Sequence, residues 1–178
     1  MPDAKRVPTL LLTGTIGSGK TAVATELGLV LEARGLLSAI IDLDWLNWVH
    51  LGHEFDAYDP LLVSNLTAIW PNFRAAGVQY FVLVRALQDP ALLTALRAAL
   101  PQANITVVCL TAPATLIAER LRCRDSGEIL AEHLQETVAM AASMDAAGIV
   151  RVADVVVDNG DRPVRAVALE VLDSIGWG

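Results

Sequence analysis

Residues 11–21 read LLTGTIGSGKT, a short apolar run that leads directly into a glycine-rich loop. The pattern G-x-x-x-x-G-K-[ST] is formed here by Gly14, Gly19, Lys20 and Thr21. The run at 7–13 predicts a buried strand, and the residues from about 19 to 34 predict a helix. A strand before the loop and a helix after it are the context that a phosphate-binding loop requires.

This loop is the first candidate binding site, and its eight residues are called the phosphate loop below: Gly14, Thr15, Ile16, Gly17, Ser18, Gly19, Lys20 and Thr21. Its glycines let backbone N–H groups point toward an anion, and the helix that starts here adds the positive end of its dipole. Lys20 can bridge the β- and γ-phosphates of a triphosphate, while the Thr21 hydroxyl binds Mg²⁺. We therefore expect a nucleoside triphosphate, with ATP favoured, and Mg²⁺ at this loop.

Composition places the chain among ordinary globular domains. Its 178 residues are 54% hydrophobic and 19% charged, which fits one domain with a substantial core. The formal net charge of -7 argues against a broad surface for nucleic acid or for an anionic membrane. The first apolar run is too short for a signal peptide or a membrane span, and the spacing of Cys109 and Cys123 suits neither a metal site nor a disulfide framework. We expect a cytoplasmic protein with reduced thiols.

Apolar runs of strand length alternate with helical patterns along the whole chain. Strands are predicted at 7–13, 36–44, 78–84, 105–110 and 154–158. Helices are predicted at about 19–34, 60–76, 90–100, 113–123, 128–147 and 163–175. Pro71 should kink the second helix or divide it in two. Five near-continuous apolar strands alternating with helices predict an α/β fold, with a five-stranded parallel sheet covered on both faces.

Acidic residues indicate how the nucleotide is used. Motor ATPases end the third strand with acids, whereas this chain has Val84 and Arg85 there, and it lacks the Asn-Lys-x-Asp of GTPases. Asp42 and Asp44 instead end the second run, and positions two apart in a strand share one face. One carboxylate could hold Mg²⁺ and the other could accept a proton from an attacking hydroxyl, although either could also cap the following helix. This arrangement is typical of a kinase.

With GTIGSGKT and DLD placed in this order, the chain resembles the small-molecule kinases of the P-loop superfamily. These include shikimate kinase, gluconate kinase, adenylylsulfate kinase and chloramphenicol phosphotransferase. The resemblance implies a three-layer P-loop fold like that of nucleoside monophosphate kinases, with Asp42 near Mg²⁺ and Asp44 at the acceptor hydroxyl. The stretch ERLRCRDSG is similar to the lid of these families, which implies a short helical lid at about 120–130 with Arg120 and Arg124 at the mouth of the site, where they support the transferring phosphate. Alternatively, these arginines only pair with Glu119 or Asp125 on a solvated face. Near the C-terminal end, the resemblance implies that Asn159 and Arg162 lie beside the adenine.

The acceptor side is predicted at about 44–76, together with the end of the third strand. It holds most of the aromatic residues and several polar ones: Trp45, Trp48, His50, His53, Tyr58, Trp70, Phe73, Arg74 and Arg85. These side chains could form an aromatic pocket in which Arg74 or Arg85 pairs with an anionic group. They could equally be packing residues between the second helix and the sheet. The glycine-rich turn that shikimate kinases carry after the third strand reads VRAL here, so no named substrate is implied.

The leading hypothesis is an ATP- and Mg²⁺-dependent kinase that phosphorylates a hydroxyl of a small metabolite or natural product. In this reading the catalytic residues are Lys20, Asp44, Arg124 and Arg120, and the metal is held by Thr21 and Asp42. A nucleoside or nucleotide kinase is an alternative, in which Trp45 or Trp48 stacks on a base. A regulatory module that binds ATP without transferring phosphate is another. We expect a monomer or homodimer that binds no nucleic acid and no membrane.

Overall fold

The computed structural model describes residues 6–50 and 58–178, and its centre is one parallel sheet. The strands are β1 (Val7–Thr13), β2 (Ser38–Asp42), β3 (Tyr80–Val84), β4 (Ala103–Thr111) and β5 (Val155–Asp158). They lie in the order β2-β3-β1-β4-β5, and every neighbouring pair is parallel. The predicted five-stranded parallel sheet is confirmed.

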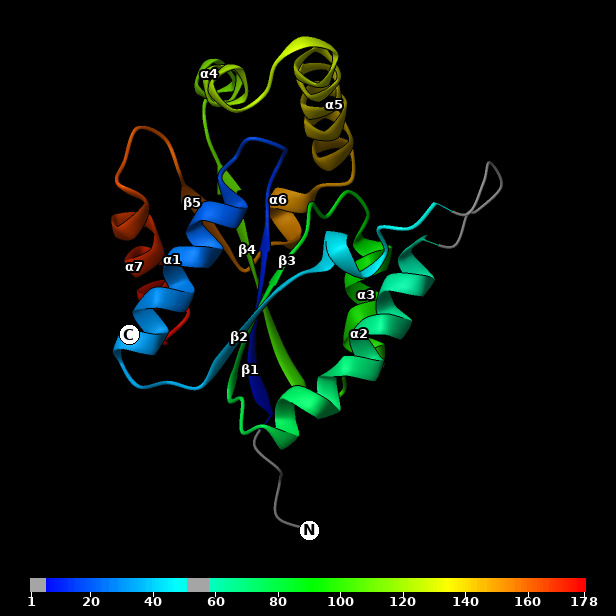
Figure 1. The fold of residues 1–178 in the computed structure, drawn as a ribbon, viewed down its shortest axis with the longest axis vertical. Coiled ribbons are helices and arrows are strands. Elements are labelled where there is room, and N and C mark those ends of the chain that lie inside the picture. The colour runs from blue at the N-terminus through cyan, green and yellow to red at the C-terminus, as the bar shows by residue number, and fades with distance from the viewer. Residues whose placement is uncertain (1–5, 51–57) are drawn as a thin grey trace.

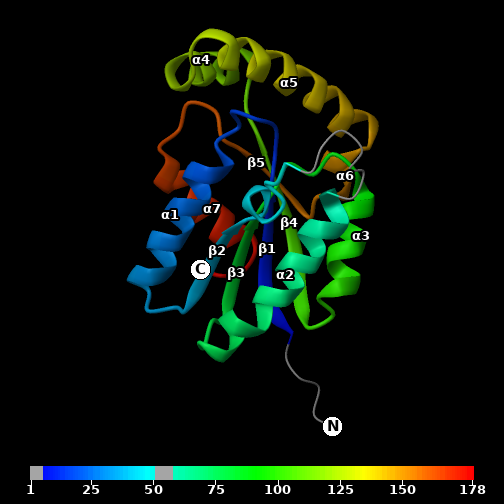
Figure 2. The same cartoon turned by 45° about the vertical axis from the view of Figure 1, so that its right-hand side comes forward.

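Helices cover both faces of the sheet and one of its ends. They are α1 (Lys20–Ala33), α2 (Tyr58–Ala75), α3 (Pro90–Ala99), α4 (Ala114–Arg124), α5 (Gly127–Ala146), α6 (Ile149–Val152) and α7 (Val164–Ser174). Figure 1 shows α1 and α7 against one face and α2 and α3 against the other, so the fold has three layers. Figure 2 shows that α4 and α5 lie across the carboxyl end of the strands. None of the helices in the described part of the chain is both long and apolar enough to cross a bilayer.

Local sequence signals explain where several helices begin and end. Helix α1 ends at Gly35, whose φ of 70° is the left-handed conformation that glycine adopts without strain. Helix α3 begins at Pro90 because the Asp89 carboxylate accepts a hydrogen bond of 2.8 Å from the Ala91 N–H. These two boundaries match the ones that the sequence predicts.

The sheet divides the core into two apolar clusters because successive side chains of a strand point to opposite faces. On the α2 and α3 side, Leu11 packs with Trp70 and Phe81, whose rings stack at a centroid distance of 3.8 Å. On the α1 and α7 side, Leu10 and Leu12 pack with residues of both helices. The apolar β1 strand is therefore buried on both faces, and the loop that follows it starts from a rigid position.

One strand boundary is predicted wrongly, and one of the two outcomes expected at Pro71 does not occur. The apolar run at 36–44 forms a strand only as far as Asp42, and Asp44 lies in a 3-10 helix, η1 (Leu43–Leu46). The strand ends because the Asp42 side chain accepts a hydrogen bond from the Asp44 N–H, which turns the backbone. Pro71 does not divide α2 into two helices, because α2 runs through it from Tyr58 to Ala75. The buried Trp70 side chain anchors the helix at this point.

We predict that Thr13→Val lowers the free energy of unfolding by about 1 to 3 kcal/mol, the usual cost of a buried donor without a partner. The buried Thr13 Oγ1 accepts a hydrogen bond of 2.8 Å from the Leu87 N–H, and valine keeps the shape but removes the acceptor. Urea denaturation measures the difference. Thr94→Val is the matched control because Thr94 is exposed, and it should change stability by less than about 0.5 kcal/mol. Equal losses in the two variants would contradict the prediction.

Candidate active site

The phosphate loop connects β1 to α1 in a conformation that only glycine permits at three positions. Gly14, Gly17 and Gly19 have φ values of 146°, 77° and 95°. A Cβ at Gly14 would lie 2.6 Å from the Leu110 carbonyl oxygen, and one at Gly19 would lie 2.3 Å from Asn159 Nδ2. The loop is therefore packed tightly by its neighbours and leaves its own backbone to line the site.

Lys20 is the central charged group of this site. Its Nζ donates hydrogen bonds of 2.9 Å to the carbonyl oxygens of Gly14 and Thr15, so the side chain folds back over the loop. Burial lowers the pKa of Lys20 to about 8, while the negative charges of Asp44 and Asp42 oppose this shift. The buried amine therefore loses its proton at a lower pH than an exposed lysine does, and an incoming phosphate would stabilise its protonated form.

Asp42 is the carboxylate at the end of β2. It lies opposite Val84 of β3, which in turn lies opposite Leu12 of β1, so β3 separates Asp42 from the strand that leads into the loop. Its Oδ1 accepts the 3.0 Å hydrogen bond from the Asp44 N–H. Burial is the main cause that raises the pKa of Asp42 above its usual value. The structure thus shows the capping role that the sequence left open, and the hydrogen bond uses one of the two carboxylate oxygens.

Asp44 is held by Arg85, the residue directly after β3. The Arg85 guanidinium makes an ion pair with Asp44 and a second one, of 3.4 Å, with Asp59 at the start of α2. Arg85 is thus paired with two carboxylates. Arg74 donates to the Val78 carbonyl oxygen beyond the other end of α2, so the structure does not bring Arg74 to this site.

Arg120 and Asn159 connect α4 and the segment after β5 to the phosphate loop. Arg120 Nη2 donates to the carbonyl oxygens of Asn159 and Gly160, at 2.9 and 2.8 Å. Asn159 Nδ2 in turn donates to the Ser18 carbonyl oxygen at 2.6 Å. Arg162 donates to the Asp158 carbonyl oxygen at 3.0 Å and so holds the same segment. Arg120 therefore braces the loop in this structure, and its contact with phosphate stays a prediction.

Arg124 lies where the sequence expects a lid, at the end of α4. Its Nε and Nη2 donate to the two Asp125 carboxylate oxygens at 2.8 and 2.9 Å. His133 of α5 contacts the same carboxylate, with 2.8 Å between Nδ1 and Oδ2. The hydrogen bonds from Arg124 and then His133 lower the pKa of Asp125 to about 2. Only Asp125 and Ser126 separate α4 from α5, so the segment at about 120–130 connects two helices, and its role as a lid stays a prediction.

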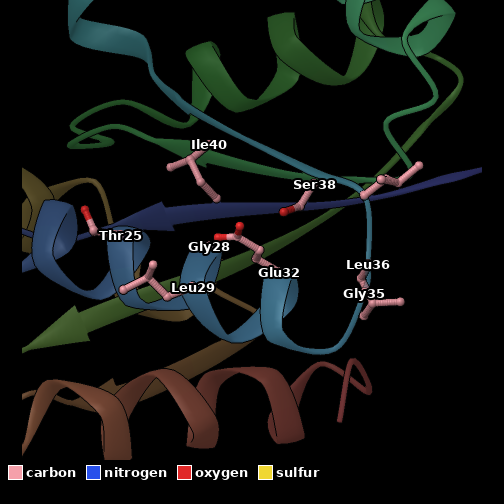
Figure 3. Close-up of a pocket in the computed structure, with 9 residues that line it drawn as sticks. Thr25, Gly28, Leu29, Glu32, Gly35, Leu36, Ser38 and Ile40 are labelled. Atoms are coloured by element: carbon pink, nitrogen blue, oxygen red, sulfur yellow. The ribbon is translucent and has the colours of Figure 1, made fainter.

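Two cavities lie outside this group of charged residues. One, of about 420 Å³, is lined by Thr15, the end of β4 and apolar residues of α4 and α5. Leu134, Val138 and Ala141 of α5 line this cavity. The other, of about 570 Å³, is a surface groove between α1 and β2, lined by residues such as Leu29, Glu32 and Ile40 (Figure 3). It contains no residue of the phosphate loop, so we do not place the reaction there.

The residues of the site fit a triphosphate and a magnesium ion. Ser18 Oγ is buried and has no hydrogen-bond partner within the described ranges, and the glycine cradle leaves no room for side chains. Among residues 6–50 and 58–178, no group of three or more His, Cys, Asp or Glu could hold a metal by itself. Magnesium bound with phosphates needs only one or two protein oxygens, and Thr21 and Asp42 are the candidates.

Two of the predicted acceptor-side residues have side chains that the structure does not describe. His53 falls within 51–57, and the side chain of Tyr58 is not described. Trp70 and Phe73 belong to the core around Phe81, so for these two the packing interpretation is confirmed. Trp45 and Trp48 are exposed.

Comparison with known proteins identifies the fold of the chain but not its substrate. No protein-family model matches the chain, and no curated protein matches it. A gluconokinase structure from Sinorhizobium meliloti 1021 is 20% identical, with a TM-score of 0.64 over 97% of this chain and 94% of that one. Shikimate kinase from Acinetobacter baumannii in complex with shikimate is 19% identical, with a TM-score of 0.61 over 97% and 95%. APS kinase from Mycobacterium tuberculosis in complex with AMPPNP and APS is 20% identical, with a TM-score of 0.57 over 96% and 98%.

The chain has the fold of the P-loop small-molecule kinases. The three-layer P-loop arrangement that the sequence predicts is thereby confirmed. At such low identity the likeness says nothing of the substrate.

Gly19→Ala should weaken the binding of Mg-ATP at least about tenfold, because a Cβ at this position collides with Asn159 and φ is positive. Gly35→Ala is the control: its φ is 70° but nothing lies within 4 Å of its Cβ. It should cost about 1 to 2 kcal/mol of stability and leave the affinity within about twofold. Calorimetric titration with Mg-ATP measures the affinity of both variants. Equal affinities of Gly19→Ala and Gly35→Ala would contradict the prediction.

Binding of Mg-ATP above pH 8 should be coupled to proton uptake. The pKa of Lys20 is about 8 in the free protein, and a bound triphosphate favours the protonated amine, so the affinity should fall as the pH rises above 8. Calorimetry at pH 8.5 in two buffers of different ionisation enthalpy should report more than about half a proton taken up. Lys20→Arg keeps its charge at this pH and should take up none. No uptake by the unmodified protein would show that Lys20 is already fully charged.

Proposed function

We propose that this protein transfers the γ-phosphoryl group of ATP to a hydroxyl of a small molecule. One observation carries the proposal: the lysine of the phosphate loop and two carboxylates lie in one electrostatic neighbourhood. Asp44 and Asp42 are the two negative charges that act on the buried Lys20 amine. A site for the donor phosphate and a candidate base for the acceptor are thus close enough to interact electrostatically, which fits the proximity that phosphoryl transfer requires. The likeness of the fold to kinases supports the same proposal.

In this proposal the phosphate loop binds the donor. Its backbone and Lys20 hold the β- and γ-phosphates, while Thr21 and Asp42 hold magnesium. The ion, when bound, neutralises phosphate charge that would otherwise repel the attacking oxygen. Asn159 and Arg162 belong to the segment that carries the adenine side of the site. ATP is favoured over GTP because the chain lacks the Asn-Lys-x-Asp sequence that reads guanine.

Asp44 acts on the acceptor. Its carboxylate, oriented by the Arg85 guanidinium, accepts the proton of the acceptor hydroxyl as the new O–P bond forms and the bond to ADP breaks. Arg124 and Arg120, at the mouth of the site, would support the transferring group once α4 and α5 close over it, which also excludes water. We place this reaction in the cytoplasm, with the protein acting as a monomer or homodimer and binding neither nucleic acid nor membrane.

A module that binds ATP without transferring phosphate is the second candidate. Val84 and Arg85 favour it, because the strand next to β1 ends without the acid that many P-loop enzymes use. In that case Asp44 would only anchor α2 through Arg85 and Asp59.

Asp44→Asn separates the two candidates. Loss of the base should lower acceptor-dependent ADP formation by about 10²- to 10⁴-fold. The affinity for Mg-ATP should stay within about twofold, because Asp44 does not belong to the phosphate loop. The assay is ADP release with a panel of hydroxylated metabolites, alongside calorimetric titration with Mg-ATP.

The matched control is Asp59→Asn, which removes the other carboxylate on the same arginine. It should lower turnover less than about tenfold. If the unmodified protein binds ATP but no acceptor raises ADP release above that of Asp44→Asn, the binding module replaces the kinase.

A further inference from the structure

Two large indole side chains are exposed directly after the candidate base. Trp45 is 69% exposed and Trp48 is 75% exposed, and their rings stack on each other at a centroid distance of 4.8 Å with 23° between the planes. Stacking covers one face of each ring and leaves the outer faces open. Paired exposed indoles cost solvation free energy, and such a patch usually marks a binding surface.

The turn that carries Trp45 is held by a buried side chain and by hydrogen bonds, and Trp48 stacks on Trp45. Leu43 of η1 is fully buried, and the Asp42 carboxylate caps the turn. Asn65 Nδ2 of α2 donates to the Leu46 carbonyl oxygen at 2.5 Å. With Asp44 paired to Arg85, the backbone beneath Trp45 is fixed on both sides. Trp45 directly follows Asp44 in η1, so the stacked pair of indoles adjoins the candidate base along the chain.

Carboxylates outnumber the cations around the indoles. Between Arg34 and Arg74 the sequence contains no lysine and no arginine. In the described part of this region, Asp42, Asp44 and Asp59 face two cations, Arg85, which pairs with two of them, and Lys20, which interacts with Asp44 and Asp42. The expectation that Arg74 or Arg85 offers its charge to an anionic acceptor thus finds no support, since Arg74 is distant and Arg85 is engaged.

We propose that the acceptor is a hydroxylated molecule that carries a protonated amine, such as an amino sugar or an amino alcohol. An indole face attracts a cation through its quadrupole, and surrounding carboxylates add to that attraction. The ammonium group lies against the open face of Trp45 or Trp48, and a neighbouring hydroxyl reaches Asp44. An acceptor with a carboxylate is repelled by the same acids. This inference rests on the proposed function, because it takes Asp44 as the acceptor side of a kinase site.

Three matched probes test the charge preference: glucosamine, glucose and glucuronate, which differ in an amine, a hydroxyl or a carboxylate. Each is titrated into the full chain in the presence of Mg²⁺ and AMPPNP, while nitrogen-15 NMR follows the indole N–H signals of the four tryptophans. Glucosamine should shift the Trp45 and Trp48 signals and bind at least about fivefold more tightly than glucose, with glucuronate weakest. Equal affinities, a preference for glucuronate, or no shift at these two indoles with any probe would overturn the proposal.

Variants locate the binding surface. Trp45→Ala and Trp48→Ala should each weaken glucosamine binding about fivefold or more, and Asp44→Asn should reduce its preference over glucose. Trp177→Phe is the control, because Trp177 packs on Tyr80 near the C-terminus and should leave every affinity unchanged. The signal of the buried Trp70 indole reports whether each variant is folded.

A second set of samples, with ATP in place of AMPPNP and ADP release as the readout, separates this inference from the proposed function. If AMPPNP does not bind, or if ATP is never turned over, the kinase proposal fails whatever the order of the probes. If ATP is turned over with neutral or carboxylate acceptors and amines are inert, the kinase proposal stands and the amine inference falls.

Discussion

The close approach of three neighbours to the phosphate loop is the constraint on which the rest of the site depends. Side chains at Gly14, Gly17 and Gly19 would collide with the Leu110 carbonyl oxygen, with Ile117 and with Asn159. These partners belong to β4, to α4 and to the segment after β5. The glycines therefore do more than free the backbone to face an anion. They let elements from the second half of the chain close around a loop that belongs to its first twenty-one residues.

That packing explains the state of Lys20. Because the loop is enclosed, the amine is buried against carbonyl oxygens, and desolvation outweighs the attraction of Asp44 and Asp42. A lysine exposed to solvent would stay fully charged and would bind any anion. Here burial has removed water from the amine, and a bound phosphate would stabilise its charge, so the enclosure favours a polyanion that fills the cradle.

Features set by a few neighbouring residues could be predicted from the sequence, and features set by distant partners could not. The strand, the loop and the start of α1 follow from residues 7–21 alone, as does the Asp89 cap of α3. The contact between Asn159 and Ser18 joins positions 141 residues apart, and the Arg85 pairs span 41 and 26 residues. The end of β2 lies two residues before the predicted one for a different reason: the Asp42 side chain competes with the strand for a backbone N–H, and a run of apolar residues does not reveal where this happens.

The acids of the candidate site lie one strand farther from the phosphate loop than an acid at the end of β3 would. An acid at the end of β3 would stand next to β1 and beside the loop, whereas this chain has Val84 and Arg85 there and carries its acids on β2 and η1. Arg85 compensates for the longer reach, because it draws the Asp44 carboxylate toward the β3 end. Its second pair, with Asp59, attaches the start of α2 to the same point. A movement of α2 would thus change the position of Asp44 through one guanidinium, which couples the acceptor side of the site to the helix that bounds it.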